Sequence, residues 1–455
     1  MPGIDRQRLA DLLERERGTF AGRHPRSRAA YRAAATHLLG NVPMTWMNKA
    51  AGRFPVYLAE ARGATVTDLD GHRYVDLCLG DTAAMAGHSP APTVAAVQRR
   101  FAEAGGATAM LPTEDAAWVG AELARRFGVP RWSFSLTATD ANRVALRMCR
   151  QVQQRGKILI FLHAYHGTVD ETVATLDAEG RVVPREGNVG APVDPAVTTR
   201  VVEFNDLDAL DRELSFGDVA CVLMEPALTN IGIVLPAPGY LEGVRELTRR
   251  HGSLLVNDET HTLSAGPGGC TLAWGLEPDL VTVGKAIAGG IPAGAYGLSA
   301  EVADRVAAHR DADLVDTGGV GGTLAGNALS VAAMRATLEH VLTDQAFEHM
   351  TGLGTRFTDG VRGVIDACGV PWSVVQLGAR AEYRFCSPPP VNGGRSAAAG
   401  DDQLDDYLHV YLHNRDILLT PFHNMALMCP ATTEADVDRH TEVFGAAVAE
   451  LAGAG

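Results

Sequence analysis

The chain has 455 residues, of which 46% are hydrophobic and 21% charged, a composition typical of a globular protein with two or three domains. Its formal net charge of −14 argues against nucleic acid as a partner. No apolar run reaches the roughly 18 residues of a membrane span, so we expect no membrane segment.

The chain begins with a charged, amphipathic stretch, MPGIDRQRLADLLERERGTF, which lacks the apolar segment of a secretion signal. Seven cysteines are spread along the chain, and no two of them form a CxxC pair. An odd number of widely spaced cysteines indicates free thiols in a reducing compartment rather than a disulfide framework. These features predict a cytoplasmic protein.

Residues 54–78 alternate apolar and polar positions around a turn at 68–71, which predicts antiparallel hairpins. The turn sequence Asp-Leu-Asp-Gly is too short to be a calcium-binding loop. We assign residues 1–90 to an N-terminal segment of helix and hairpins that joins a smaller domain.

Short aliphatic runs in the middle of the chain predict buried strands. These runs lie at 157–164, 219–226, 253–259 and 279–285. Residues 239–252 predict a helix, because apolar residues recur on one face, arginines occupy the last turn and glycine follows. Strands that alternate with helices predict a mostly parallel sheet with right-handed crossovers. We therefore expect an α/β fold with a large domain over 91–325 and a smaller α+β domain over 326–455.

Three of the predicted strands end in ionisable residues, Glu225, Asp258 and Lys285. In open parallel sheets the ligand binds beyond the carboxyl ends of the strands, so we expect these side chains in one crevice. Lys285 is one of only three lysines among 40 basic residues. Arginine can replace lysine as a surface charge but not as a nucleophile, because guanidinium stays protonated. A lysine amine beside apolar strands, with an aspartate that can protonate a pyridine nitrogen, predicts a pyridoxal phosphate site.

The stretch LLVNDETHTLSAGPGGCTLAWGLEPDLVTVGKAIAGGIPAGAYGLS, at 254–299, resembles the core of the class III aminotransferases. It is most similar to the glutamate-1-semialdehyde aminomutase branch of that family. The resemblance extends from about residue 42 to the C-terminus, with the motifs in the same order. It implies fold type I, the α/β architecture of many pyridoxal-phosphate-dependent enzymes, with pyridoxal 5'-phosphate as the cofactor.

The resemblance implies a role for each matching residue around the cofactor ring. Lys285 matches the lysine that forms an aldimine with the cofactor, and Asp258 matches the carboxylate that pairs with the pyridine nitrogen. Thr260 and Tyr165 match residues on the two faces of the ring, with threonine where the family usually has valine. His261 would lie near the phenolic oxygen.

Further matches imply the floor of the site and its phosphate-binding end. His166 follows the stacking tyrosine in the motif AYHG, and Glu225 in MEP matches a glutamate that supports the floor. Thr137, Ala138 and Thr139 stand where the family usually has Ser-Gly-Ser/Thr before a helix. Backbone N–H groups at a helix start can still hold a phosphate, and Thr139 retains a hydroxyl.

Substrate recognition is where the chain departs most from the aminomutase branch. An arginine near the start of the matched region binds the substrate carboxylate there, whereas this chain has Thr45 or Trp46. Asp81 falls where the branch has an aromatic residue near the substrate. A lost cation and a gained anion argue against glutamate semialdehyde and favour a donor with a polar or cationic group. The remaining candidate substrate residues are Arg380, Arg384 and His423.

The resemblance implies transfer of an amino group from an amine or amino acid to a keto or aldehyde acceptor. An aminomutase of the glutamate-1-semialdehyde type is the alternative, followed by a racemase or decarboxylase on the same scaffold. A cofactor-sensing regulator is disfavoured, because no DNA-binding segment accompanies the core. Thr323 matches the threonine that reaches the phosphate of the neighbouring subunit's cofactor, which implies a homodimer with shared active sites.

His409 and His413 have the spacing of two metal ligands on one helix face. No third ligand or acidic catalytic residue is spaced to join them. We therefore favour a structural role for both histidines and predict no metal.

Overall fold

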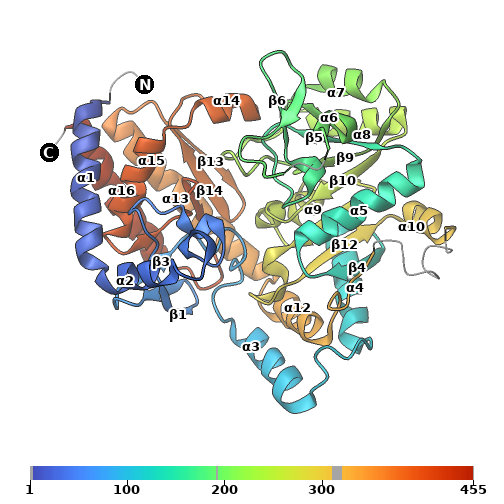
Figure 1. The fold of residues 1–455 in the computed structure, drawn as a ribbon, viewed down its shortest axis with the longest axis horizontal. Helices are drawn as coiled ribbons and strands as arrows, with labels where there is room; N and C mark the ends of the chain where they lie inside the picture. The colour runs from blue at the N-terminus through green and yellow to red at the C-terminus, as the bar shows by residue number, and fades with distance from the viewer. Residues whose placement is uncertain (1–3, 191–192, 310–319, 454–455) are drawn as a thin grey trace. The chain divides into compact units, whose positions relative to one another are not determined.

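The computed structural model describes residues 4–190, 193–309 and 320–453, and Figure 1 labels its elements. The chain divides into two compact units. Unit 1 comprises Met1–Ser89, Glu348–Pro389 and Ala399–Gly455, and unit 2 comprises Pro90–Phe347 and Pro390–Ala398.

Unit 2 is built on a seven-stranded sheet with the order β4-β12-β11-β10-β9-β5-β8. All neighbours from β8 to β11 are parallel, whereas β12 is antiparallel to both β11 and β4. The four strands expected from the aliphatic runs are β5, β9, β10 and β11, so the mostly parallel sheet is confirmed. The strands of unit 2 are β4 (Arg131–Ser135), β5 (Lys157–Phe161), β6 (Ala174–Leu176), β7 (Val182–Pro184), β8 (Thr199–Val202), β9 (Val219–Met224), β10 (Leu254–Asp258), β11 (Leu280–Gly284) and β12 (Gly294–Leu298).

Both faces of this sheet are buried. Successive side chains of a strand point to opposite faces, so neighbouring residues of β5 belong to different core clusters. Ile158 and Ile160 of β5 belong to a core cluster that includes residues of α5. Leu159 and Phe161 of the same strand belong to a second cluster, with residues of α7 and α8. Helices on both sides explain why the strands read as continuous aliphatic runs (Figure 1).

The helices of unit 2 connect these strands. The helix expected over 239–252 is α8, and Gly252 ends it in the left-handed conformation with φ 63°. The helices are α3 (Ala91–Gln98), the π-helix η3 (Arg99–Ala104), α4 (Glu114–Phe127), α5 (Ala138–Gln153), η4 (Asp170–Thr172), α6 (Pro195–Thr198), α7 (Leu207–Leu214), α8 (Tyr240–His251), η5 (Thr262–Ala265), α9 (Gly269–Ala273), η6 (Lys285–Ala288), α10 (Ala300–Ala307), α12 (Ala328–His340) and α14 (Gly393–Ala398). α12 belongs to unit 2, whereas the sequence analysis assigned it to the C-terminal domain.

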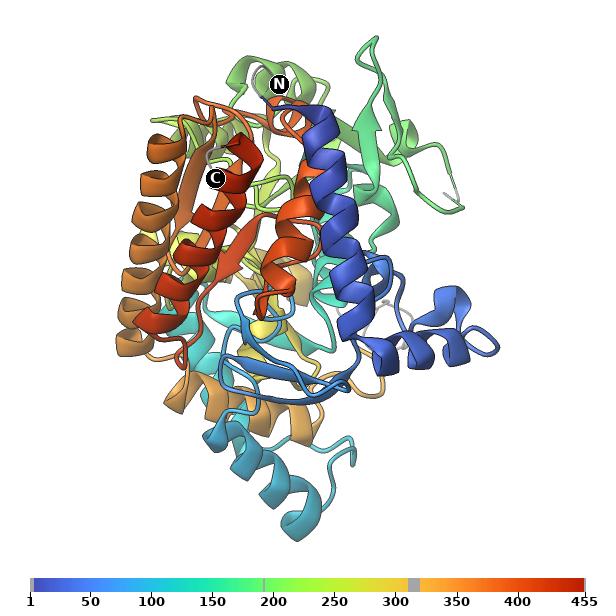
Figure 2. The same ribbon diagram turned by 90° about the vertical axis from the view of Figure 1, so that its left-hand side faces the viewer.

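Unit 1 combines the amino-terminal and carboxyl-terminal parts of the chain. Its helix α1 packs along α15, and α15 packs along α16, as Figure 2 shows. Arg17 of α1 donates a hydrogen bond to Asp406 of α15 at 2.6 Å, which ties the two segments together. The helices are α1 (Arg6–Arg23), α2 (Pro25–Ala34), η1 (Leu39–Asn41), η2 (Thr45–Asn48), most of α13 (Asp344–Cys368), α15 (Asp402–His413) and α16 (Glu434–Ala452).

Two small sheets complete unit 1. The hairpins expected over 54–78 are present as the antiparallel strands β1, β2 and β3, and β15 joins them to give the order β1-β2-β3-β15. The second sheet has the order β13-β14-β16. The strands are β1 (Leu58–Arg62), β2 (Thr65–Asp68), β3 (Arg73–Asp76), β13 (Ser373–Leu377), β14 (Arg380–Arg384), β15 (Ile417–Leu418) and β16 (Met425–Leu427).

Among the described residues, no helix has both the length and the apolar character needed to cross a bilayer.

A fully buried histidine in unit 1 makes the stability of the protein depend on pH. His440 of α16 packs between Phe357 and Phe444, with ring centroids 4.5 and 5.7 Å away, and neither of its ring nitrogens has a hydrogen-bond partner among the described residues. Burial lowers the pKa of His440 to about 3. The unfolded chain, where histidine has a pKa of about 6.5, therefore binds the proton first as the pH falls.

We expect stability to be lost as the pH falls below about 6.5, and His440→Leu to remove part of this loss. The difference in the free energy of unfolding between the variant and wild type should shift by about 2 kcal/mol in favour of the variant when the pH falls from 7.5 to 5. Urea unfolding at the two pH values measures this gain, with the exposed His37→Leu as the control. An equal pH dependence in wild type and His440→Leu would contradict the assignment.

Candidate active site

Lys285 lies directly beyond the carboxyl end of β11, at the first position of η6. Its backbone has φ 52°, a left-handed conformation that costs a non-glycine residue about 1–2 kcal/mol. Its Nζ lies 2.6 Å from Nε2 of His261. Strained backbone of this kind persists where the surrounding structure fixes a functional side chain.

Asp258 is the last residue of β10 and is 3% exposed. Its Oδ2 accepts hydrogen bonds from Nδ1 of His166 at 2.9 Å and Nδ2 of Asn142 at 2.8 Å, and its Oδ1 accepts one from the Thr260 N–H at 3.1 Å. Burial raises the pKa of Asp258, but the hydrogen bond and charge of His166 with the other donors outweigh it, so the net pKa is lowered. Asp258 is therefore held as a carboxylate inside the protein.

Asn142 and Thr282 orient this carboxylate, and neither was predicted from the sequence. Thr282 of β11 donates to Oδ1 of Asn142 at 2.6 Å, so the amide nitrogen of Asn142 must face Asp258. The one polar side chain in the aliphatic run LVTVG was the available signal for Thr282. In the parallel register of β10 and β11, Thr282 lies opposite Asp258. Lys285 follows Thr282 by three residues, just beyond the end of β11.

The start of α5 lies against the backbone before Lys285. A side chain at Gly284 would come within 2.9 Å of the Ala138 Cβ and 3.0 Å of its backbone nitrogen, so glycine is required for this approach. Thr137 is the N-cap of α5 and accepts from the Asp140 N–H, and Oγ1 of Thr139 accepts from the Thr168 N–H at 3.2 Å. The N–H groups of the first turn and the dipole at the start of this 16-residue helix suit a phosphate dianion.

A second chain of contacts begins at Glu225, which directly follows β9 and is 2% exposed. The Tyr165 N–H donates to its Oε1 at 2.9 Å, and Thr229 donates both its N–H and its hydroxyl to Oε2. The Thr229 Oγ1 also lies 2.9 Å from Nδ1 of His261. Thr229 thus links two predicted site residues, although no sequence motif marked it.

The residues at the carboxyl end of this sheet fit pyridoxal phosphate. They supply an amine for its aldehyde, a buried carboxylate for its ring nitrogen and a helix start for its phosphate. Nε2 of His166 is buried without a hydrogen-bond partner among the described residues. Buried polar atoms of this kind are commonly satisfied by a bound ligand.

All candidate substrate residues, Arg380 included, belong to unit 1. Lys285 and Asp258 belong to unit 2. Trp46 contacts the ring of Phe422 at 5.8 Å, and the adjacent His423 lies 3.4 Å from Glu382 of β14. Arg384 is two residues further along β14 and so lies on the same face of this strand. Arg380, also on that face, donates to Thr82, the residue that follows Asp81.

The histidines of unit 1 take part in contacts within its core. His409 lies 3.2 Å from Oδ1 of Asn424, and burial lowers its pKa to about 4. His24, Asp68 and His72 offer three ligand atoms within 4.8 Å of one another. The Tyr74 hydroxyl lies 2.8 Å from His24 and 2.7 Å from Asp68. The Asp68 Oδ2 lies 3.4 Å from Nε2 of His24 and 3.2 Å from Nδ1 of His72. Because the Tyr74 hydroxyl already hydrogen-bonds to both His24 and Asp68, we interpret the cluster as a hydrogen-bond network.

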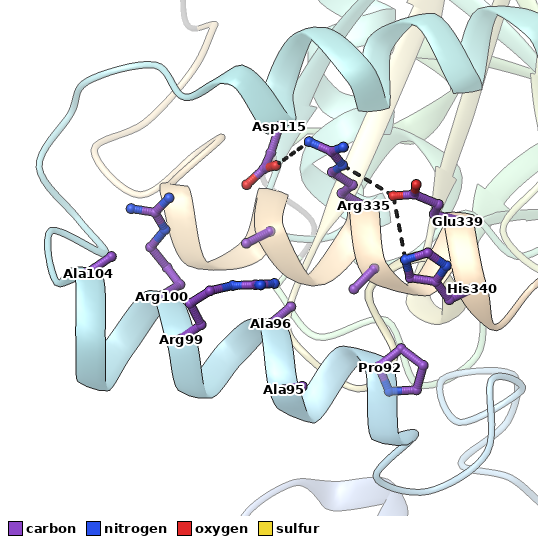
Figure 3. Close-up of a pocket in the computed structure, with 12 residues that line it drawn as sticks. Pro92, Ala95, Ala96, Arg99, Arg100, Ala104, Asp115, Arg335, Glu339 and His340 are labelled. Atoms are coloured by element: carbon purple, nitrogen blue, oxygen red, sulfur yellow. Dashed lines mark hydrogen bonds and ion pairs between the residues drawn. The ribbon is translucent and has the colours of Figure 1, made fainter.

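Unit 2 also has a groove of about 620 Å³ between α3, η3 and α12, shown in Figure 3. Arg335 lies between Asp115 at 2.9 Å and Glu339 at 3.2 Å, and Arg99 and Arg100 extend from the opposite helix. None of the predicted site residues lines this groove. The groove is therefore distinct from the site at Lys285.

Comparison with known proteins identifies the family of the chain. The model of the class-III aminotransferase family matches residues 46–426. A glutamate-1-semialdehyde 2,1-aminomutase of Anaeromyxobacter sp. (strain Fw109-5) is 32% identical over 411 residues, which cover 89% of this chain and 93% of that protein.

Solved structures give the same result. The structure of a glutamate-1-semialdehyde-aminomutase from Pseudomonas aeruginosa PAO1 is 48% identical, with a TM-score of 0.95 over 99% of this chain and 100% of that one. A variant of it with alanine in place of a lysine was solved in complex with PMP. An omega-transaminase from Sphaerobacter thermophilus is 27% identical, with a TM-score of 0.85 over 94% of this chain and 98% of that one. The chain belongs to the class-III aminotransferase family of fold type I enzymes, which use pyridoxal phosphate.

Proposed function

We propose that the protein moves an amino group between two carbons of one substrate, as an aminomutase of the glutamate-1-semialdehyde type. The observation that carries amino-group chemistry is that the Lys285 amine and the buried Asp258 carboxylate both lie at the carboxyl ends of the adjacent strands β11 and β10. The names of the relatives, led by the 48% identical structure, support the aminomutase over the aminotransferase that the sequence analysis placed first.

Each site residue has a distinct task in this proposal. When bound, pyridoxal phosphate withdraws electrons from the carbon that carries the amino group, so the proton on this carbon becomes acidic. Lys285 binds the cofactor covalently and, once released, moves the proton at that carbon. Asp258 holds a proton on the ring nitrogen, and His166 with Asn142 keeps its carboxylate in place. Thr137, Ala138 and Thr139 bind the phosphate.

An assay without any amino acceptor separates the two activities. With glutamate 1-semialdehyde as the only substrate, an aminomutase should convert many equivalents per active site into the isomer whose amino group has moved from carbon 2 to carbon 1. An aminotransferase should stop after about one equivalent, because its cofactor stays in the amino form. Product quantified by mass spectrometry against the enzyme concentration gives the answer, and a yield of one equivalent or less would contradict the aminomutase.

An aminotransferase is the second candidate, because of the side chains that unit 1 offers. Thr45, Trp46 and Asp81 stand where the aminomutase branch has a carboxylate-binding arginine and an aromatic residue. Glu382 lies between Arg380 and Arg384 on one face of β14 and offsets part of their positive charge. A substrate with a cationic or neutral group suits these residues better than one whose carboxylate must be bound there.

We also propose a homodimer with shared active sites, in which Thr323 reaches the phosphate site of the partner subunit. Thr323 precedes α12 and is exposed in the single chain. Phe101, Met110 and Leu111 in and after η3 are exposed by 69%, 75% and 72%, and neighbouring apolar side chains of this size are commonly covered by another protein surface. The cytoplasmic location remains a prediction from the sequence.

A further inference from the structure

The contacts around Lys285 fix the direction of every hydrogen bond between it and Glu225. Thr229 has a single hydroxyl proton, which it donates to Oε2 of Glu225. Its Oγ1 must therefore accept the hydrogen bond from Nδ1 of His261, 2.9 Å away. A neutral imidazole with its proton on Nδ1 carries a lone pair on Nε2. That lone pair faces the Lys285 Nζ at 2.6 Å, so the lysine is the donor.

We propose that His261, Thr229 and Glu225 form a proton relay that removes a proton from Lys285 before the lysine bonds to the cofactor. This inference rests on the proposed role of Lys285. The proton on Nζ passes to Nε2 of His261, the Nδ1 proton passes to Oγ1 of Thr229, and the hydroxyl proton passes to Oε2 of Glu225. Lysine becomes a neutral amine, histidine exchanges one neutral tautomer for the other, and the carboxylate becomes a carboxylic acid. No electron or second reactant is required.

Glu225 is suited to receive this proton. It lies 2% exposed at the end of β9, and burial raises its pKa, as does the negative charge of Asp258. The charge of His166 and the hydrogen bonds from Thr229 and Tyr165 lower its pKa but do not cancel the effect of burial. Arg185 also interacts electrostatically with this carboxyl.

A purely structural chain of hydrogen bonds would hold the same atoms in place without moving a proton. The two roles differ in how the attachment of the cofactor depends on pH, because only a neutral amine attacks an aldehyde. A relay supplies the neutral amine near pH 7. Without it the lysine must lose its proton directly to solvent, which becomes faster as the hydroxide concentration rises with pH.

The test uses the full chain freed of cofactor, mixed with pyridoxal phosphate and followed by visible absorbance from pH 6.5 to 10. His261→Gln keeps a donor and an acceptor but cannot exchange tautomers, and Thr229→Val removes the hydroxyl link without touching Lys285. Thr262→Val is the matched control, because its hydroxyl contacts Glu259 outside the relay. We expect both relay variants to attach the cofactor roughly 10- to 100-fold more slowly at pH 7 and to approach the wild-type rate near pH 10.

Two results would overturn the relay. One is a wild-type rate in Thr229→Val and His261→Gln at pH 7, and the other is a loss of equal size at every pH. Wild-type protein that never attaches pyridoxal phosphate would overturn the proposed function together with the relay. Slow attachment at pH 7 in Thr229→Val alone, with His261→Gln unfolded, still supports the relay if Thr262→Val behaves as wild type.

Discussion

Replacement of Lys285 by alanine is expected to abolish the visible absorbance of the bound cofactor and to lower turnover by at least about 10⁴-fold. The reason is that the only other lysines of the chain, Lys49 and Lys157, lie on other segments, so neither can replace its amine at the end of β11. Phosphate binding should survive, because Thr137, Ala138 and the start of α5 do not depend on the lysine side chain. Absorbance spectra and a turnover assay with saturating pyridoxal phosphate measure both effects.

The matched control for this variant is Lys157→Ala. Lys157 is the first residue of β5, and its Nζ donates to the Ala196 carbonyl at 2.8 Å. It should keep the visible absorbance and the activity, and both variants should keep the wild-type mass in solution, about twice 48.1 kDa for the proposed dimer. Full activity in Lys285→Ala, or its loss in Lys157→Ala alone, would refute the assignment.

Asp258→Asn is expected to leave the cofactor bound but to slow proton removal by about 10²- to 10³-fold. The amide has nearly the same shape as the carboxylate, but it carries no negative charge to hold a proton on the ring nitrogen. In either orientation of the amide its nitrogen would also face a donor, the His166 and Asn142 side chains in one and the Thr260 N–H in the other. Single-turnover rates after rapid mixing with an amino donor report this step directly.

Asp218→Asn removes a carboxylate at the opposite edge of the same sheet, where Asp218 precedes β9 and pairs with Arg200. We expect its single-turnover rate to stay within about twofold of wild type, because ligands bind at the carboxyl ends of parallel strands. A rate near wild type in Asp258→Asn would show that the ring nitrogen needs no such partner here.

Local sequence patterns predict the strands and helices that carry the site and the polar residues at the strand ends. Aliphatic runs that end in Asp258 and Lys285 predict parallel strands with polar groups at one edge, and β10 and β11 are adjacent in the sheet. The helix over 239–252 was predicted within one residue at each end, because its arginine-rich last turn and its final glycine mark its limits.

Contacts between distant segments could not be predicted in this way. Asn142 orients Asp258 from a position 116 residues away, and Thr229 reaches His261 from 32 residues away. Neither residue belongs to a periodic pattern, since the role of each depends on hydrogen bonds to partners that only the folded backbone brings close. The left-handed backbone of Lys285 likewise depends on packing around Gly284, which no local propensity specifies.

The choice between aminomutase and aminotransferase could not be read from the catalytic residues, because both reactions use the same lysine and carboxylate. The sequence analysis weighed Trp46 and Asp81 against the aminomutase, whereas the relatives favour it. The candidate substrate residues Trp46 and His423 lie on η2 and on the loop before β16, and such segments can change specificity without any change in the fold.

The central claim is a covalent bond between Lys285 and pyridoxal phosphate, and borohydride reduction of the loaded enzyme tests it most directly. The chain has only three lysines, so peptide mapping by mass spectrometry can assign the reduced cofactor to one of them without ambiguity. We predict the added mass on the peptide that contains Lys285, with Lys49 and Lys157 unmodified. The added mass on either of those lysines, or on none, would contradict the account.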